Sequence, residues 1–303
     1  MDRRQFLKKL GQWAGGFGLS LPVLQMLSAA KAEVPATLLS VAEGKDYATL
    51  VLKVLDPLGG ITSFVKKDER VVIKPNIAWD RTPEQGANTH PEVVKSLVTL
   101  CLVAGASQVM VFDRSVNEER RCYENSGIKA AVESIGDRRV SCPYLDQRKF
   151  IPVRIDKGKS ITEWEFYKDA LEADCYINVP VAKQHSSSGL TLGLKNIMGI
   201  IGGRRSFIHL SIGQRIADLN TVIKPRLTLI DATRIMLRNG PSGGSLNDVK
   251  FLNTLIASSD TVAADAYATT LFQMAPEAVD STRAAYQLGL GEMDLKKIKI
   301  IRV

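Results

Sequence analysis

Short apolar runs alternate with polar stretches along the chain. Runs with strand character occupy 71–73, 108–112, 175–179, 227–230, 251–257 and 297–301. Between the first two, apolar residues recur every three or four positions from 93 to 102, which predicts a helix that Gly105 ends. A strand, a helix and a second strand in this order form a parallel βαβ unit. The pattern therefore predicts an α/β fold, a mainly parallel sheet with helices on both faces.

Further local patterns add detail to this framework. Thr89 and Glu92 have the spacing of a capping box at the start of the helix. Alternation over 151–155 and 161–166 predicts a small hairpin beside the main sheet. A polar, glycine-spaced segment runs from 180 to about 205 and leads into a helix expected at about 206–220. Asp260 is placed to cap the helix that follows the strand run at 251–257.

We expect residues 33–303 to form the α/β domain. Two lobes, 33–145 and 146–303, with a crevice between them and a hinge near 143–149, remain an alternative, although no Gly/Ser-rich linker marks the hinge. The chain has 303 residues, of which 45% are hydrophobic and 24% charged, and this composition argues against a disordered chain or a multi-span membrane protein.

The net charge of +8 divides unevenly along the chain. The first 32 residues hold five Lys/Arg and one acid, a charge of +4, which leaves +4 for the remainder. That modest excess does not favour a polyanion-binding protein, so no nucleic-acid partner is expected. The alternative interpretation, a polyanion-binding or envelope-surface protein, is supported by this charge alone.

The N-terminus has the layout of an export signal. Paired Arg3 and Arg4 precede an uncharged stretch over 10–30, which Ala30-Lys31-Ala32 follows as an A-x-A cleavage motif. It resembles a twin-arginine signal peptide, which predicts recognition by the twin-arginine translocation machinery, cleavage after Ala32 and a periplasmic location. An ordinary amphipathic N-terminal helix and an uncleaved membrane anchor stay open. Because this route carries folded proteins that often hold a cofactor, it also favours a bound prosthetic group.

The four cysteines do not predict a metal centre. No two are spaced as C-x-x-C, so we expect no cysteine-ligated iron-sulfur cluster and no zinc ribbon. Cys101 and Cys175 fall on apolar positions of a helix and a strand and are expected in the core. A disulfide between Cys122 and Cys142 after export remains open.

Candidate chemistry gathers in the glycine-spaced segment. Lys183, His185 and Lys195 stand in it, and His209 follows closely. Lysines attract an anion and glycines let the backbone approach a ligand, so the segment predicts a site for an anionic ligand or cofactor. A solvated glycine-rich loop is the competing interpretation. We hypothesise that two imidazoles and one ammonium group converge on one pocket at the carboxyl edge of the sheet.

Other polar residues are candidates for the same edge of the sheet. Lys74 and Asn76 follow the first strand run and either contact a ligand or tie down a turn. His90 is expected to be structural, whereas 239–244 is a turn or a lid. Asp231, Asp260 and Asp265 do not by themselves predict a carboxylate metal site.

The sequence resembles the domain-of-unknown-function 362 family across most of 33–303. The matching features are Ile73-Lys74-Pro75-Asn76, Thr89-His90-Pro91, the stretch from Pro180 to His185, the stretch from Thr191 to Gly199, His209, Asn239-Gly240-Pro241, Asp260 and Asp265. This resemblance implies kinship and no particular reaction.

A more distant resemblance links the segment to the nickel-pincer lactate racemase family, in which a histidine, a glycine-spaced lysine and a second histidine follow one another. It implies that Lys195 attaches the cofactor covalently, that His209 ligates the metal and that His185 is the catalytic acid/base. Leu192 occupies the place of a glycine of that family, and no histidine follows Phe112, where the family has a second one.

These inferences predict an exported protein that binds an anionic or metal-bearing cofactor, related to pincer-dependent racemases and carrying out redox or isomerase chemistry. The alternative is a periplasmic binding protein that holds an anionic small molecule without turnover. Substrate, metal and oligomeric state are left open. The predicted cofactor-binding residues are Lys74, Asn76, Lys183, Thr191, Gly193, Lys195 and Asn196.

Overall fold

The computed structural model describes residues 37–303, which form one compact unit. The predicted signal peptide at 1–32 lies outside the described residues. The strands are β1 (Thr37–Glu43), β2 (Arg70–Pro75), β3 (Gln108–Val111), β4 (Val140–Ser141), β5 (Phe150–Arg154), β6 (Glu163–Tyr167), β7 (Cys175–Val179), β8 (Val181–His185), β9 (Gly189–Thr191), β10 (Leu227–Met236), β11 (Val249–Ser258) and β12 (Ile298–Arg302). The helices are α3 (Tyr47–Leu55), α4 (Pro91–Val103), α5 (Glu119–Asn125), α6 (Ile128–Glu133), α7 (Lys168–Leu171), α8 (Gly193–Asn196), α9 (Ile212–Leu219), α10 (Thr261–Thr270) and α11 (Asp280–Gln287).

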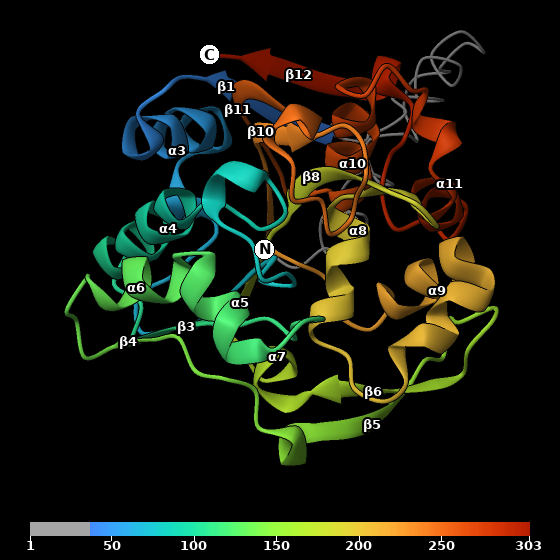
Figure 1. Cartoon of the computed structure of the whole chain (residues 1–303), viewed down its shortest axis with the longest axis horizontal. Coiled ribbons are helices and arrows are strands. Elements are labelled where there is room, and N and C mark those ends of the chain that lie inside the picture. Colours follow the sequence, from blue (N-terminus) through green and yellow to red (C-terminus); the bar gives the residue numbers. More distant parts are fainter. Residues whose placement is uncertain (1–36) are drawn as a thin grey trace, which may run out of the picture. The chain divides into compact units, whose positions relative to one another are not determined.

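Ten of these strands form one mixed, mainly parallel sheet (Figure 1). Its order is β12-β1-β11-β10-β7-β2-β3-β4, and β8 and β9 branch from β10. β11 runs antiparallel to both of its neighbours, while β2, β3, β4, β7 and β10 are parallel to one another. Strands from both sides of residue 145 are interleaved, since β1 lies between β11 and β12. The segments 33–145 and 146–303 therefore share one sheet.

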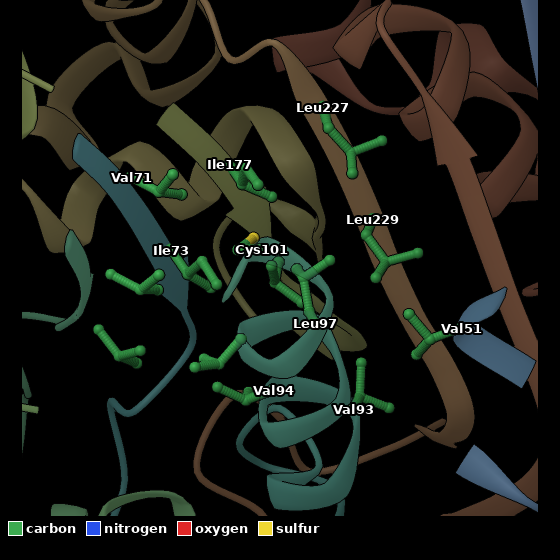
Figure 2. Close-up of a cluster of buried hydrophobic side chains, with 14 of the residues drawn as sticks. Val51, Val71, Ile73, Val93, Val94, Leu97, Cys101, Ile177, Leu227 and Leu229 are labelled. Atoms are coloured by element: carbon green, nitrogen blue, oxygen red, sulfur yellow. The ribbon is translucent and has the colours of Figure 1, made fainter. Parts of the chain in front are cut away.

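Helices cover both faces of the sheet, as the alternation along β2 shows. Val71 and Ile73 pack with α3 and α4 in one core cluster, shown in Figure 2, whereas Val72 packs in another with residues of α8, α9 and α10. Successive side chains of a strand point to opposite faces, so two cores on one strand mean two covered faces. The predicted α/β class is confirmed.

The residue predicted to cap the N-terminus of α4 is wrong. The N-cap is His90, whose Nδ1 accepts from the backbone N–H of Glu92, and Thr89 does not cap the helix. The hydroxyl of Thr89 instead donates to the carbonyl of Val179 and accepts from the N–H of Asn76. A tertiary contact with β7 therefore replaces the capping box that the spacing suggested.

Other predicted elements recur with shifted bounds. The hairpin is the separate two-stranded sheet of β5 and β6. Asp260 caps α10 by accepting from the N–H of Ala263. The helix expected at about 206–220 begins as a 3-10 helix, Arg205–Ser211, and becomes α-helical only in α9. The glycine-spaced segment, for which no strand or helix was predicted, forms β8, β9 and α8.

Two prolines open the carboxyl edge of the sheet. β2 and β7 pair in parallel as far as Pro75 and Val179, and Pro180 follows directly. Proline has no N–H to donate, so the ladder cannot continue through these positions. Beyond Pro180 the chain pairs as β8 with β10 and β9, and not with β2. The end of β2 and β8 are therefore not paired with each other, and the candidate site lies between them.

Two structural facts bear on the remaining sequence expectations. All four cysteines are buried and have free thiols, so Cys122 and Cys142 are not joined in this structure. Among residues 37–303, no helix is both long and apolar enough to cross a membrane.

Candidate functional site

A cavity of about 510 Å³ lies where β2 and β8 separate. Its volume is within the range of small-molecule sites. Eight of the nine predicted site residues line it, and they come from β2 and the loop after it, β8, β9, α8 and the 3-10 helix Arg205–Ser211: Lys74, Asn76, Lys183, His185, Thr191, Lys195, Asn196 and His209. The hypothesis that two imidazoles and an ammonium group converge on one pocket is therefore met by the geometry.

Lys74 is tied into the protein. Its Nζ lies 2.8 Å from Asp113 Oδ1 and donates to the carbonyl of Pro75 and to Asn196 Oδ1, each at 2.7 Å. Both ions of the pair are only 1% exposed. Burial lowers the pKa of Lys74, and the facing Asp113 carboxylate counteracts that effect. With three acceptors engaged, this ammonium group supports the site instead of offering a free donor to a ligand.

Gly199 makes this ion pair sterically feasible. A Cβ at that position would overlap Asp113 Oδ1 and the end of the Lys74 side chain. The glycine spacing of the segment therefore has a packing cause here, in addition to any approach of a ligand.

Asn196 and Asn76 form the polar floor of the cavity. Asn196 accepts from Lys74 and Asn76 and donates to the carbonyl of Lys74 and to Asn178 Oδ1. Asn76 Oδ1 accepts from Lys183 Nζ at 3.3 Å. Because their amides are largely committed to protein partners, these two residues position the lysines.

The amine of Lys183 is partly occupied by contacts within the protein. Its Nζ donates to Asn76 and to the carbonyl of Ala87, and it lies 5.9 Å from the centre of the Trp79 ring. The pKa of Lys183 is lowered well below its usual value by burial and then by the positive charge of Lys195. One of its three donor positions remains for a ligand.

Lys195 differs from the other two lysines. Its side chain is 9% exposed and lines the cavity, yet within residues 37–303 its Nζ has no hydrogen-bond or ion-pair partner. Burial, followed by the charge of Arg205, lowers the pKa of Lys195 to about 7. A large fraction of this amine is therefore uncharged near neutral pH. Because its nitrogen makes no hydrogen bond to the described part of the chain, its lone pair is available to a ligand.

The two histidines meet across a serine. Ser187 Oγ lies 3.2 Å from His185 Nδ1 and 3.0 Å from His209 Nδ1, and the ring centres are 6.0 Å apart. The N–H of Ser187 donates to His185 Nδ1 at 3.1 Å, so that atom carries a lone pair and the proton of the neutral ring is on Nε2. His185 is buried and His209 exposed, which gives the pair an inner and an outer member.

Burial and, after it, nearby cations keep both rings neutral. Burial and the charges of Lys195 and Lys183 lower the pKa of His185 to about 3. Burial and Lys195 also lower the pKa of His209. Both rings are therefore neutral near pH 7, and the basicity of His185 rises once a bound anion offsets the surrounding positive charge.

The cavity wall carries excess positive charge. Arg114 and Arg205 line it and donate to backbone carbonyls, and within the described part of the chain neither has a carboxylate partner. Burial and the charge of Arg114 lower the pKa of Arg205 to about 10. Thr191 Oγ1 is buried at this wall with no hydrogen-bond partner in residues 37–303. Uncompensated cations and an unsatisfied hydroxyl are the features expected of a site for an anion.

Gly193 does not line the cavity, in contrast to its predicted role. Its N–H donates to Asp265 Oδ1 at 2.6 Å and its carbonyl accepts from Asn178. A Cβ at 193 would lie 2.7 Å from Asp265 Oδ1, so the glycine allows close contact with α10 instead of contact with a ligand. Leu192 packs in the core with residues of β10 and leaves the cavity unobstructed.

Other sequence candidates have structural roles. His90 stacks on Tyr47 with ring centres 4.0 Å apart, and its pKa is lowered to about 4, mainly by burial. Asp231 forms a buried ion pair with Arg234 at 2.9 Å. Only Pro241 of the 239–244 turn reaches the cavity.

Sequence reasoning missed Trp79, the pairing of Asp113 with Lys74 and the bridging position of Ser187. The nearness of Ser187 to His185 was available as a signal, since two positions separate them in the chain. Nothing local marks Trp79, which the loop after β2 brings to the cavity.

No cluster of three His, Cys, Asp or Glu side chains able to hold a metal ion occurs within residues 37–303. A protein-only metal cage is thus not formed by this part of the chain. A metal carried by an organic group needs fewer protein ligands, and His209 Nε2, with no protein partner in the described region, is suited to be one.

Comparisons with known proteins place the chain in context. The family model "Domain of unknown function (DUF362)" matches residues 71–270. A thylakoid-associated protein of Synechocystis sp. is 28% identical over 250 residues, which cover 78% of this chain and 73% of that protein.

Two solved structures also align with the chain, each with a TM-score of 0.44. A protein from Thermotoga maritima is 14% identical over 81% of this chain and 60% of its own. Lactate racemase apoprotein from Thermoanaerobacterium thermosaccharolyticum is 15% identical over 73% of this chain and 54% of its own. This chain thus spans less than two thirds of the length of either solved protein.

Proposed function

The chain belongs to the DUF362 family, whose description names no reaction, and from that premise we propose that its cavity binds a small organic anion, as cofactor or substrate, for acid–base or redox chemistry. One observation carries the proposal: the buried Lys195 amine has no partner in residues 37–303 and stands in a cavity walled by cations. Leaving such a group unpaired costs stability, and a ligand that accepts from it removes that cost.

Electrostatics favours an anion over a neutral ligand. Lys183, Lys195 and Arg205 each suppress the protonation of a neighbour, since their charges appear among the causes of lowered pKa values in this cavity. A carboxylate or phosphate placed among them relieves this repulsion. Binding of an anion should therefore be accompanied by proton uptake.

His185 and His209 supply the acid–base part of the proposal. His185 faces the same cavity as Lys195, and Ser187 joins it to the exposed ring of His209. In this tautomer His185 passes its Nε2 proton to a bound ligand while its Nδ1 takes up a proton from the Ser187 hydroxyl, and His209 connects that hydroxyl to solvent.

The residues also fit an attached, metal-bearing cofactor. The free amine of Lys195 would hold it, and His209 Nε2 would ligate its metal. When bound, such a group would supply hydride transfer, while His185 moves the proton at the reacting atom. This version rests on the resemblance of the segment to the pincer-dependent racemases.

The test is purification of the chain from its native host, followed by intact mass, elemental analysis and thermal unfolding with carboxylates and phosphate. We expect stabilisation by at least one anion, lost in Lys195→Ala, since the variant removes the free donor. A mass adduct on the Lys195 peptide supports the attached cofactor. Absence of any shift across the anions, in a chain without adduct or metal, would refute the proposal.

A binding protein without turnover is the second candidate. It is favoured by the commitment of Lys74, Asn76 and Asn196 to structural bonds, which leaves few groups for chemistry. In that case an anion stabilises both the wild type and the His185→Gln variant, and neither protein converts the anion into a product.

We also propose export through the twin-arginine route. The support is the order of Arg3 and Arg4, the uncharged stretch and the A-x-A motif. Replacing both arginines by lysine should hold the full-length chain in the cytoplasm, and fractionation with an antibody measures it. Unchanged export of that variant would contradict the proposal.

A further inference from the structure

Three buried lysines line one cavity, and they differ in what their amines contact. Lys74 faces Asp113, and Lys183 donates to Asn76 and Ala87, but Lys195 has no such partner in the described part of the chain. A structural lysine is normally held by acceptors, as the first two are. The amine of Lys195, without such acceptors, is available to bind or react with a ligand.

The surroundings of Lys195 favour a nucleophile. A lysine becomes nucleophilic when burial or a neighbouring cation disfavours its charged form, and both conditions hold here. Arg205 and the buried position together bring the pKa of Lys195 to about 7. An exposed lysine at neutral pH is almost entirely protonated and unreactive.

The rest of the cavity restricts what such an amine meets. Lys183 retains a donor for a carboxylate, and Thr191 Oγ1 has no partner among residues 37–303. Apolar side chains form another part of the wall: Ala78, Trp79, Val116 and Met198. A ligand matched to this lining has a carboxylate, an adjacent electrophilic carbon and an apolar side chain.

We infer that Lys195 forms an imine with the carbonyl carbon of an α-keto acid that has an apolar or aromatic side chain. The inference rests on the proposed function, since it assumes an organic anion in this cavity, and it names the class of that anion. The carboxylate lies against Lys183, and the neighbouring carbonyl carbon meets the amine.

The step is balanced within the site. The lone pair of Lys195 Nζ forms a bond to the carbonyl carbon, and one N–H proton moves to the carbonyl oxygen, which gives a carbinolamine. The second N–H proton leaves with that oxygen as water, and the C=N bond forms. His185, which lines the same cavity, relays these protons, and no oxidant or reductant is needed.

The test traps the imine. The full chain, expressed in a host where its intact mass shows no modification, is incubated near pH 7.5 with phenylpyruvate and sodium cyanoborohydride, which reduces imines in preference to ketones, and the adduct is located by peptide mass mapping. We expect one reduced adduct on Lys195, formed at least about tenfold faster than on any exposed lysine, because of the difference in amine protonation.

Matched variants and a matched ligand decide the outcome. Lys195→Arg keeps the charge and should abolish the adduct, whereas Lys157→Arg, at an exposed lysine, should leave it unchanged. Phenyllactate, which has a hydroxyl group in place of the ketone, should stabilise the protein against heat without forming an adduct. An adduct spread over surface lysines, or undiminished in Lys195→Arg, overturns the inference.

The two proposals fail in different ways. Thermal stabilisation by phenyllactate and phenylpyruvate without any trapped adduct refutes the imine and leaves anion binding intact. No stabilisation and no adduct with these two acids refutes the imine and counts against the proposed function as well.

Discussion

At the scale of single residues, the charge state of each buried cation depends on the acceptors around it. Lys74 and Asp113 are both 1% exposed and face each other at 2.8 Å. Taking two ions out of water is costly, and removal of only one leaves the other without compensation. The pair is thus a stability requirement of the site, whereas the unpaired Lys195 is available for chemistry.

Asp113→Asn tests this distinction. The amide keeps an acceptor for the N–H of Ile77, which Asp113 Oδ2 accepts at 2.5 Å, but it removes the negative charge facing Lys74. We expect a loss of about 3 to 5 kcal/mol in the free energy of unfolding, measured by urea titration. The double variant with Lys74→Met should recover part of that loss. A single variant as stable as the wild type would show that the pair is not needed.

At the scale of elements, the short α8 is held from outside. Asp265 of α10 accepts from the N–H groups of Gly193 and Leu194, and Asn220 donates to the carbonyl of Leu194. A four-residue helix has little stability of its own, so these contacts determine where Lys195 lies. Asp265 is therefore a positioning residue.

Asp265→Asn should disturb that position. Its amide nitrogen would face a backbone N–H, which leaves at least one buried donor unsatisfied and costs about 1 to 3 kcal/mol. We also expect slower reductive trapping of the imine at Lys195, a rate that simple destabilisation of α10 does not change.

Asp260→Asn is the matched control, since it also sets an amide nitrogen against a backbone N–H, that of Ala263 or of Glu292, but at the start of α10 and away from α8. It should leave the trapping rate unchanged. Equal rates in both variants would show that Asp265 does not position Lys195.

Elements also show the limits of local sequence patterns. β2, β3 and β7 were predicted from short apolar runs, and α4 from apolar residues that recur at helical spacing. β8 and β9 were not predicted, because polar residues and glycines dominate them. Their strand form comes from pairing with β10 and with each other, and no local pattern reports that.

At the scale of the whole molecule, buried amines make stability depend on pH. The folded-state pKa of Lys195 is about 7 against an ordinary value of 10.5. The unfolded chain thus binds an extra proton between these values, so stability is complete above about pH 10.5 and is lost as the pH falls towards 7.

Lys195→Met should remove this dependence. Between pH 7 and 10.5 we expect the wild type to gain on the order of 3 to 5 kcal/mol relative to the variant, from the difference in pKa. Urea unfolding of both proteins at several pH values measures the difference. Parallel stability curves would contradict the lowered pKa of Lys195.

The sequence by itself determined the alternation of strands and helices, the hairpin, the cap of α10 and the set of polar residues that meet at the carboxyl edge, because these depend on periodicity and on where each strand ends. Only the tertiary structure decided which of those residues is free. Lys74 contacts Asn196 across 122 positions of the chain, and Lys183 contacts Asn76 across 107. Burial and pairing are set by such distant neighbours, and they alone separate a supporting ammonium group from a reactive amine.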